Sequence, residues 1–198
     1  EDRKRARFIN CLSGFKSVNL IGTKSNDGNT NLSIISSAFH LGANPALLGF
    51  IIRPDTSPRH TLDNIRSTKL LTLNHVSNSF WKQAHQTSAR YQRNESEFTE
   101  CGLEQEYLNE FFAPFVKESN IKLALEFVRE VLIKENSTHM IITKIKDVYL
   151  PSEALKDDGH VDIESCGSLA VSGLDNYHKT KSIGRLSYAK PNKKLEIF

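Results

Sequence analysis

A short stretch near the start of the chain mixes hydrogen-bonding side chains with apolar ones. Its polar, small and aromatic members are Thr30, Asn31, Ser33, Ser36, Ser37, Ala38 and Phe39. One interpretation is an edge strand whose hydroxyls face water or bond to the backbone. The other is the wall of a ligand pocket, where small residues allow close approach and backbone donors meet the ring oxygens of a planar heterocycle such as a flavin.

Cationic and hydroxyl-bearing side chains follow soon afterwards in the chain. They are Arg53, Arg59, His60, Thr61 and Asn64. Guanidinium groups beside the start of a helix suit a phosphate, because the first turn of the helix presents amides without internal partners. The alternative for the two arginines is solvated surface charge. We favour the phosphate interpretation, because the basic helix start lies so near the polar stretch.

The elements that must position these residues are mainly strands. Residues 15–23 alternate well enough for a strand, and residues 24–29 form a turn that carries Asp-Gly. Further strands are expected over residues 46–52, 70–76 and 139–149, and the last of these alternates most clearly.

Short helices are expected between the strands. They cover residues 61–68, 79–88 and 103–112, and Pro114 follows the last of them. Residues 121–131 fit either a strand or one face of a helix. The sequence therefore predicts a mainly β fold with inserted helices.

The chain of 198 residues is long enough for one hydrophobic core, and we expect a single domain over residues 1–198. Strands joined by turns, with short helices between them, indicate a barrel or a sandwich. From Gly173 onward the sequence is polar and basic with little periodicity, which predicts a C-terminal tail.

Composition argues against several classes of protein. The net charge of +3 is too small, and its charges too scattered, to indicate a nucleic-acid partner. No apolar run approaches the roughly 20 residues that cross a bilayer, so no membrane partner is expected. Three widely spaced cysteines without a Cys/His cluster indicate reduced thiols in a cytoplasm rather than a metal site.

Several motifs, taken in order, resemble those of the flavin reductase-like family of FMN-binding split barrels. Asn31 stands five residues before Ser36, and Asn44-Pro45 precedes an apolar strand. A family motif of the type Lys-Asp-Thr-Leu-x-Asn-Ile reads Arg-His-Thr-Leu-Asp-Asn-Ile over residues 59–65. Later resemblances are LLTLNHV, SEFTECGL, FVKESNIKLAL and HMIITKIKDVYLP. The order of motifs carries the resemblance, which spans nearly the whole chain.

The resemblance implies FMN as the cofactor and assigns roles to the polar residues. Residues 31–39 would lie along the isoalloxazine and ribityl chain, with the backbone amides of Ser36, Ser37 and Ala38 near the polar edge of the ring. The phosphate would be held by Arg53, Arg59 and Thr61, with Asn64 close by and His60 as a further donor or a helix cap.

Two later residues and the assembly complete what the resemblance implies. Ser88 would border the flavin. Tyr177 and His178 would cover the pocket of the same or a partner subunit, or would belong to a disordered tail. The resemblance also implies a homodimer with the flavin near the interface.

The implied function is an oxidoreductase of flavin reductase type that passes electrons from NAD(P)H or another donor through bound FMN. Because the flavin carries the chemistry, no catalytic side chain is expected. The Gly-Asp-His signature that accompanies nicotinamide use in the family is absent, and Ile34 and Ile35 replace its usual Pro and aromatic residue. Two alternatives remain: a flavoredoxin-like electron carrier that does not oxidise NAD(P)H, and a split barrel that binds another planar ligand, such as pyridoxal phosphate or haem.

Overall fold

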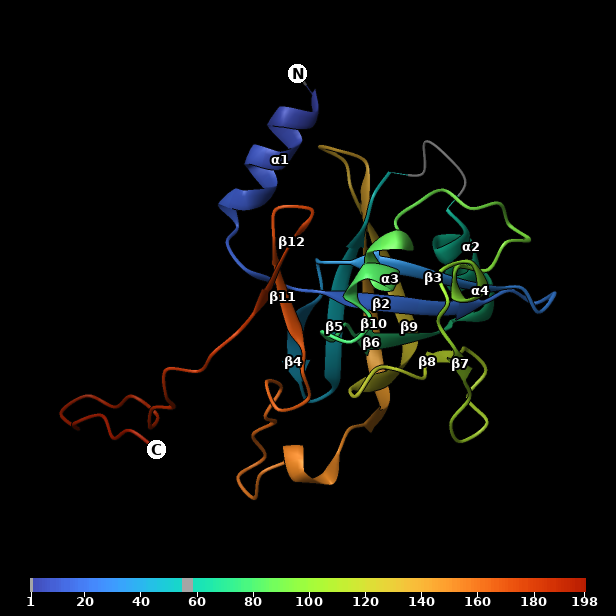
Figure 1. Ribbon diagram of the computed structural model, residues 1–198. Coiled ribbons are helices and arrows are strands. Elements are labelled where there is room, and N and C mark those ends of the chain that lie inside the picture. The colour runs from blue at the N-terminus through green and yellow to red at the C-terminus, as the bar shows by residue number, and fades with distance from the viewer. Residues whose placement is uncertain (1, 55–58) are drawn as a thin grey trace.

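One antiparallel sheet of seven strands forms the body of the protein (Figure 1). It is seen in a computed structural model that describes residues 2–54 and 59–198. The strand order across the sheet is β3-β2-β6-β9-β10-β5-β4. The strands are β2 (Asn19–Lys24), β3 (Thr30–Ile35), β4 (Phe39–Ala43), β5 (Ala46–Ile52), β6 (Leu70–His75), β9 (Lys122–Ile133) and β10 (Thr138–Tyr149).

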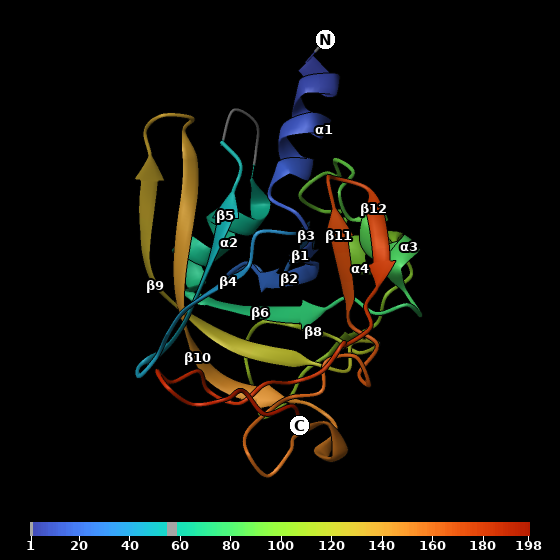
Figure 2. The same cartoon turned by 90° about the vertical axis from the view of Figure 1, so that its left-hand side faces the viewer.

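The two edge strands of this sheet are neighbours in the chain. β3 ends at Ile35 and β4 begins at Phe39, so only residues 36–38 separate the opposite edges of the sheet. The sheet must therefore curl until its edges approach each other. The long β9–β10 hairpin carries the bend in Figure 2, and its pairing has register irregularities near Thr143 and Ile145, which increase local twist. The result is the split barrel expected from the sequence.

Shorter elements fill the connections between these strands. They are α1 (Asp2–Leu12), β1 (Lys16–Ser17), α2 (His60–Thr68), α3 (Trp81–Gln86), α4 (Glu97–Glu100), β7 (Gln105–Glu106), β8 (Phe115–Val116), the 3-10 turn η1 (Ser152–Ala154), β11 (Leu169–Ser172) and β12 (Asn176–Lys179). β1, β11 and β12 form a small second sheet, and β7 pairs with β8. α1 has no buried residue and stands away from the barrel, with its C-terminal end beside β11 and β12 (Figures 1 and 2).

Two apolar clusters lie on opposite faces of the strand pair β2–β3. Residues that pair directly in an antiparallel ladder share a face, and here Ile21 pairs with Ser33 while Leu20 pairs with Ile34. Ile21 belongs to a cluster with residues of α2 and β5, inside the barrel. Leu20 belongs to a cluster with residues of α3, α4 and β11, outside it. We call these two sides of β2–β3 the barrel face and the outer face.

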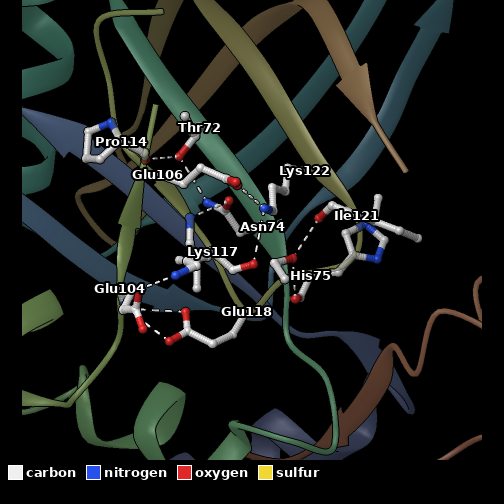
Figure 3. A network of polar contacts seen from close by, with 12 residues as sticks. Thr72, Asn74, His75, Glu104, Glu106, Pro114, Lys117, Glu118, Ile121 and Lys122 are labelled. Carbon is white, nitrogen blue, oxygen red and sulfur yellow. Dashed lines mark hydrogen bonds and ion pairs between the residues drawn. The ribbon is translucent and has the colours of Figure 1, made fainter. Parts of the chain in front are cut away.

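A buried polar network fastens the segment before β9 to β6 (Figure 3). Asn74 Nδ2 donates to the Leu20 carbonyl at 3.2 Å and to Thr72 Oγ1 at 3.0 Å, and Asn74 Oδ1 accepts the Val116 amide at 3.0 Å. Thr72 Oγ1 in turn donates to the Pro114 carbonyl at 2.7 Å. Because these buried groups have partners, polar residues are tolerated in the middle of a core strand.

Most of the elements expected from the sequence are present. β2, β5, β6 and β10 confirm the expected strands, α2 and α3 confirm two of the helices, and the ambiguous segment at 121–131 lies largely in β9. The helix expected over residues 103–112 is wrong. Gln105 lies in β7 and pairs with Val116, while Asn109 and Glu110 have φ angles of 47° and 57°, which a right-handed helix does not contain. Strand pairing overrode the local pattern there.

The ends of the chain also differ from expectation. The N-terminal helix α1 was not predicted. Tyr177 and His178 lie in β12, which pairs with β11, so the interpretation of these two residues as part of a disordered tail is wrong. Among the described residues, no helix combines the length and the apolar character needed to span a membrane.

Candidate functional site

Hydrogen bonds fix the start of β3 to α2 and a residue just beyond its end to β5. At its start, Asn31 Nδ2 donates to Thr61 Oγ1 of α2 at 2.8 Å. Just beyond its end, Ser37 Oγ donates to the Ile51 carbonyl of β5 at 3.1 Å and accepts the Ile51 amide at 3.0 Å. The structure brings the polar stretch and the basic helix start together.

The first turn of α2 offers donors suited to an anion. The helical hydrogen bonding begins with the Asp63 amide, which donates to the Arg59 carbonyl at 2.9 Å, so the amides of His60, Thr61 and Leu62 precede it. Thr61 Oγ1 accepts from Asn31, which leaves its own hydrogen to donate. These groups fit the terminal phosphate of an FMN, whose charge the helix N-terminus also favours.

The two predicted arginines approach this helix start differently. Arg59 is half-buried and donates Nε to the Pro54 carbonyl at 3.1 Å, which holds its side chain beside the first turn of α2. Arg53 follows the end of β5 and is exposed. Arg59 is the N-cap residue of α2, so of the two arginines it lies nearer the helix start along the chain. His60 is the first residue of α2 and is half-buried.

Asn64 has a different task from the one the sequence suggested. It is 3% exposed, and its Nδ2 donates to Thr23 Oγ1 of β2 at 3.1 Å. Its backbone carbonyl accepts the hydroxyls of Ser67 and Thr68. The Asn64 side chain thus anchors α2 to the barrel face.

The outer edge of β3 is covered by α4. The Leu32 amide donates to Glu97 Oε2 at 2.8 Å, and Thr30 Oγ1 is bonded to Ser96 Oγ at 2.7 Å and accepts Gln105 Nε2 at 3.0 Å. Burial raises the pKa of the Glu97 carboxyl, while the bond from Leu32 opposes that rise. The Thr30 hydroxyl is therefore bonded to side chains of the protein, and its contact with a flavin stays a prediction.

The far end of β3 opens onto a cavity of about 530 Å³ that residues 36–38 help to line. Ser33 lies on the barrel face, because it pairs with Ile21. Phe39 begins β4 and lies across Gly49 of β5, where an added Cβ would stand 2.6 Å from its ring. Ser36 and Ala38 thus border open space, whereas the Ser37 hydroxyl is bonded to β5.

Ser88 and Tyr177 lie with the elements of the outer face. Ser88 is exposed just after α3. Tyr177 packs with Trp81 at a ring-centroid distance of 5.2 Å, and its hydroxyl is bonded to His85 Nδ1 at 2.8 Å. Burial raises the pKa of Tyr177 to about 12. The structure therefore separates these two residues from Asn31 and Thr61, which meet on the barrel face.

A charged cluster behind α2 was not anticipated. Arg66, in the last turn of α2, donates Nε and Nη2 to the carboxylate of Glu130 on β9 at 2.9 and 2.7 Å. His139 Nδ1 on β10 contacts the same carboxylate. The Arg66 hydrogen bond, followed by that of His139, lowers the pKa of Glu130. The cluster ties α2 to the β9–β10 hairpin. The pairing of β9 with β10 brings Glu130 near His139, and the packing of α2 against this hairpin adds Arg66.

Comparison with known proteins gives the family. The family model described as a flavin reductase like domain matches residues 14–166. A solved structure from Shewanella frigidimarina NCIMB 400, described as a candidate flavin reductase with a split barrel domain, is 53% identical with a TM-score of 0.92, and the match covers 96% of this chain and 94% of that one.

More distant structures share the fold. Nitrilotriacetate monooxygenase component B from Bacillus cereus is 18% identical with a TM-score of 0.84 and 94% coverage of both chains. The flavoredoxin of Desulfovibrio vulgaris (Miyazaki F) is 20% identical with a TM-score of 0.73, covering 90% of this chain and 92% of that one. A comparison with curated proteins returned no match. With the family model and the Shewanella structure in agreement, the chain belongs to the flavin reductase-like family of split-barrel proteins.

Proposed function

We propose that this protein is an FMN-binding oxidoreductase of flavin reductase type, which passes electrons from NAD(P)H or another donor through bound FMN. The bond between Asn31 and Thr61 carries the proposal. It joins Asn31, which is expected along the flavin, to Thr61, which is expected at the phosphate, and residues 36–38 follow the other end of the same strand. Family membership supports the same cofactor.

The residues of the chain bind and orient in this proposal. Arg59, the Thr61 hydroxyl and the first amides of α2 hold the phosphate, while Asn31 and Asn64 fix α2 against β2 and β3. Bound FMN supplies the redox chemistry, accepting a hydride and passing electrons on. The apolar barrel cluster around Phe50 and Leu62 keeps water from the inner side. No side chain of the protein is required as nucleophile or base.

The absorption spectrum of the purified protein tests the cofactor. Two bands, in the near-ultraviolet and the blue, are expected from flavin, whereas a haem or pyridoxal phosphate spectrum would overturn the proposal. Calorimetry should then show tighter binding of FMN than of FAD, because the helix start suits a terminal phosphate. Equal affinities for the two flavins would contradict the phosphate assignment.

The second candidate function is an electron carrier that does not oxidise NAD(P)H. The missing Gly-Asp-His signature favours it. Mixing NADH or NADPH with the FMN-loaded protein in a stopped-flow instrument separates the two functions. Bleaching of the blue flavin band within the turnover time supports the reductase. A band that persists with both nucleotides but disappears with a reduced protein donor supports the carrier.

We also propose a homodimer in the cytoplasm. Exposed apolar side chains on α1 and on the β9–β10 hairpin support an association surface: Phe8, Ile9, Leu12, Val128, Leu132 and Val148. Free Cys101 and Cys166 are consistent with a reducing compartment. The dimer should elute at twice 22.4 kDa in size-exclusion chromatography, with or without flavin. Elution as a monomer with full FMN affinity would contradict it.

A further inference from the structure

The last residues of the chain form a hairpin that leaves the body of the protein. Leu186 pairs with Ile197 in an antiparallel bridge, and backbone hydrogen bonds of 2.9 and 3.0 Å flank this pair. Pro191 and Asn192 occupy the turn, and Asn192 has a φ of 63°, which is the pattern of a type II turn. We call residues 183–198 the arm. It is the red end of the chain in Figure 1, where it reaches away from the barrel.

The arm has one apolar face, and that face is exposed. Paired residues of an antiparallel hairpin share a face, as do residues two positions apart along each strand. Leu186 and Ile197 therefore share a face, and Tyr188 and Leu195, two residues nearer the turn, lie on it too. These four side chains are 46–87% exposed. Because a lone two-stranded hairpin is marginally stable at best in water, its exposed apolar face indicates that another surface covers it.

The root of the arm is fastened to an acidic loop of the same chain. The Ser182 amide donates to Glu164 Oε2 at 2.9 Å, and Arg185 Nη2 donates to the carboxylate of Asp158. These bonds hold the start of the arm beside residues 155–164. They leave its apolar face uncovered.

An apolar hollow lies beside the same loop, where β10 leads into η1. Its volume is about 590 Å³, and we call it the groove, lined by Val148, Tyr149, Leu150, Ser152, Leu155 and Val161. Val148 and Leu155 remain 49% and 52% exposed, so the arm of the same chain leaves the groove open. Val148 also belongs to the apolar surface proposed for the homodimer, and the groove therefore continues that surface.

The arm and the groove carry opposite charges. Residues 179–198 contain six lysine and arginine side chains and one glutamate. Residues 147–164, which include every lining residue of the groove, contain six carboxylates and one lysine. Complementary charges of this kind align two surfaces as they associate. A second copy of the chain presents both surfaces, so two copies can exchange identical contacts about a two-fold axis.

We propose that the arm of each copy docks in the groove of a second copy, with the face around Tyr188 packed against Val148 and Leu155. The proposal rests on the proposed homodimer and is independent of the bound flavin. An anionic lipid surface would also attract the apolar face and the lysines, but it would leave the acidic, apolar groove empty. The match between arm and groove therefore favours the second copy.

Sedimentation velocity over a concentration series measures the dissociation constant of the dimer. Tyr188→Ser in the arm and Leu155→Ser in the groove should each weaken dimerisation at least about tenfold, because each removes a large apolar side chain from both contacts. Phe198→Ser is the matched control, since Phe198 is 74% exposed on the opposite face of the arm, and it should change the dissociation constant less than about twofold. Circular dichroism of each variant checks that it is folded.

Mixing the two weakened variants tests whether the arm docks on the partner. With one variant fluorescently labelled, mixed dimers should form at least about threefold more tightly than either variant alone, because only they keep one intact arm in one intact groove. No gain on mixing would mean that the arm does not dock on a second copy.

Other outcomes contradict the inference in separate ways. A wild type that stays monomeric would refute both the arm docking and the proposed homodimer, while the flavin spectrum of the same sample tests the cofactor independently. A dimer unaffected by Tyr188→Ser and Leu155→Ser would leave the homodimer standing without the arm. Binding to anionic lipid vesicles that Tyr188→Ser abolishes, with no change in dimerisation, would assign the arm to a membrane surface.

Discussion

The two faces of the β2–β3 pair use polar groups in opposite ways. On the barrel face, Asn31 bonds to Thr61 and Asn64 bonds to Thr23, side chain to side chain. On the outer face, aromatic and aliphatic side chains dominate, among them Phe80, Phe98, Trp81 and Tyr177. At the edge between the faces, Glu97 meets the amide of Leu32.

The difference explains why one short strand carries so many hydrogen-bonding residues. Bonds on the barrel face join β3 to a helix whose first amides and Thr61 hydroxyl still have hydrogens to donate, so the polar groups there prepare a surface for an anion. Bonds at the outer edge only satisfy β3, because α4 covers it. If the proposed flavin site is correct, the structural and the ligand-binding roles belong to different sides of the same strand, and substitutions on the two faces should separate them.

The largest expected effects come from replacing one large buried side chain by alanine on each face of the β2–β3 pair. Phe98 is 1% exposed, and Phe98→Ala should lower the unfolding free energy by about 3–5 kcal/mol in urea denaturation. Leu62 is 0% exposed, and Leu62→Ala should lower it by about 2–5 kcal/mol. Only Leu62→Ala should also weaken FMN, by about tenfold, because Leu62 seats the first turn of α2. An equal loss of FMN affinity in folded Phe98→Ala would show that the faces are not independent.

A smaller effect is expected from His75, which pairs with Asn19 at the end of β6. Burial lowers the pKa of His75 to about 4. Below pH 6.5, the ordinary pKa of histidine, the unfolded chain binds a proton at His75 that the folded chain excludes. The unfolding free energy should therefore fall as the pH drops from about 6.5 to 4, by up to roughly 3 kcal/mol. The midpoints of urea denaturation at pH 7, 5.5 and 4.5 measure this loss of stability. His75→Gln should flatten this dependence, and the same slope in wild type and variant would rule His75 out as its source.

Arg59→Ala tests the ligand side of the barrel face alone. Loss of a charge-assisted contact should weaken FMN by about 1.5–3 kcal/mol, or roughly ten- to a hundredfold, and leave riboflavin, which has no phosphate, nearly unchanged. Calorimetry with both flavins measures the difference, and exposed Arg129→Ala on β9 is the control. Equal weakening of both flavins would refute the phosphate role.

The smallest effects distinguish Ser36 from Ser37. Ser37→Ala removes two bonds to Ile51 and should lower the unfolding free energy by about 1 kcal/mol. Ser36→Ala should leave stability within about 0.5 kcal/mol and weaken FMN and riboflavin by a similar small factor. Should Ser36→Ala lower stability as much as Ser37→Ala does, its hydroxyl would have a structural role instead.

Local patterns predicted much of the secondary structure and part of the candidate site. The alternation in β10 predicted its strand, because side chains of a half-buried strand point to opposite faces, and the short apolar run predicted β5 as a strand covered on both faces. The pattern of residues 61–68 predicted α2, and the motif order predicted the family. For the predicted ligand residues, contacts with a flavin remain a prediction.

Long-range pairing decided the rest, because a local pattern shows that a residue is buried but not against which neighbour. Only the curled sheet makes β3 and β4 opposite edges separated by residues 36–38. The register of β2 with β3 divides the polar stretch between two faces, the packing of α2 on β2 brings Asn64 to Thr23, and β12 brings Tyr177 to the outer-face cluster. The sequence by itself determined which side chains were available for a phosphate and a planar ring. The tertiary structure decided which of them have other partners, because contacts between elements use the side-chain hydrogen bonds of Thr30, Ser37 and Asn64.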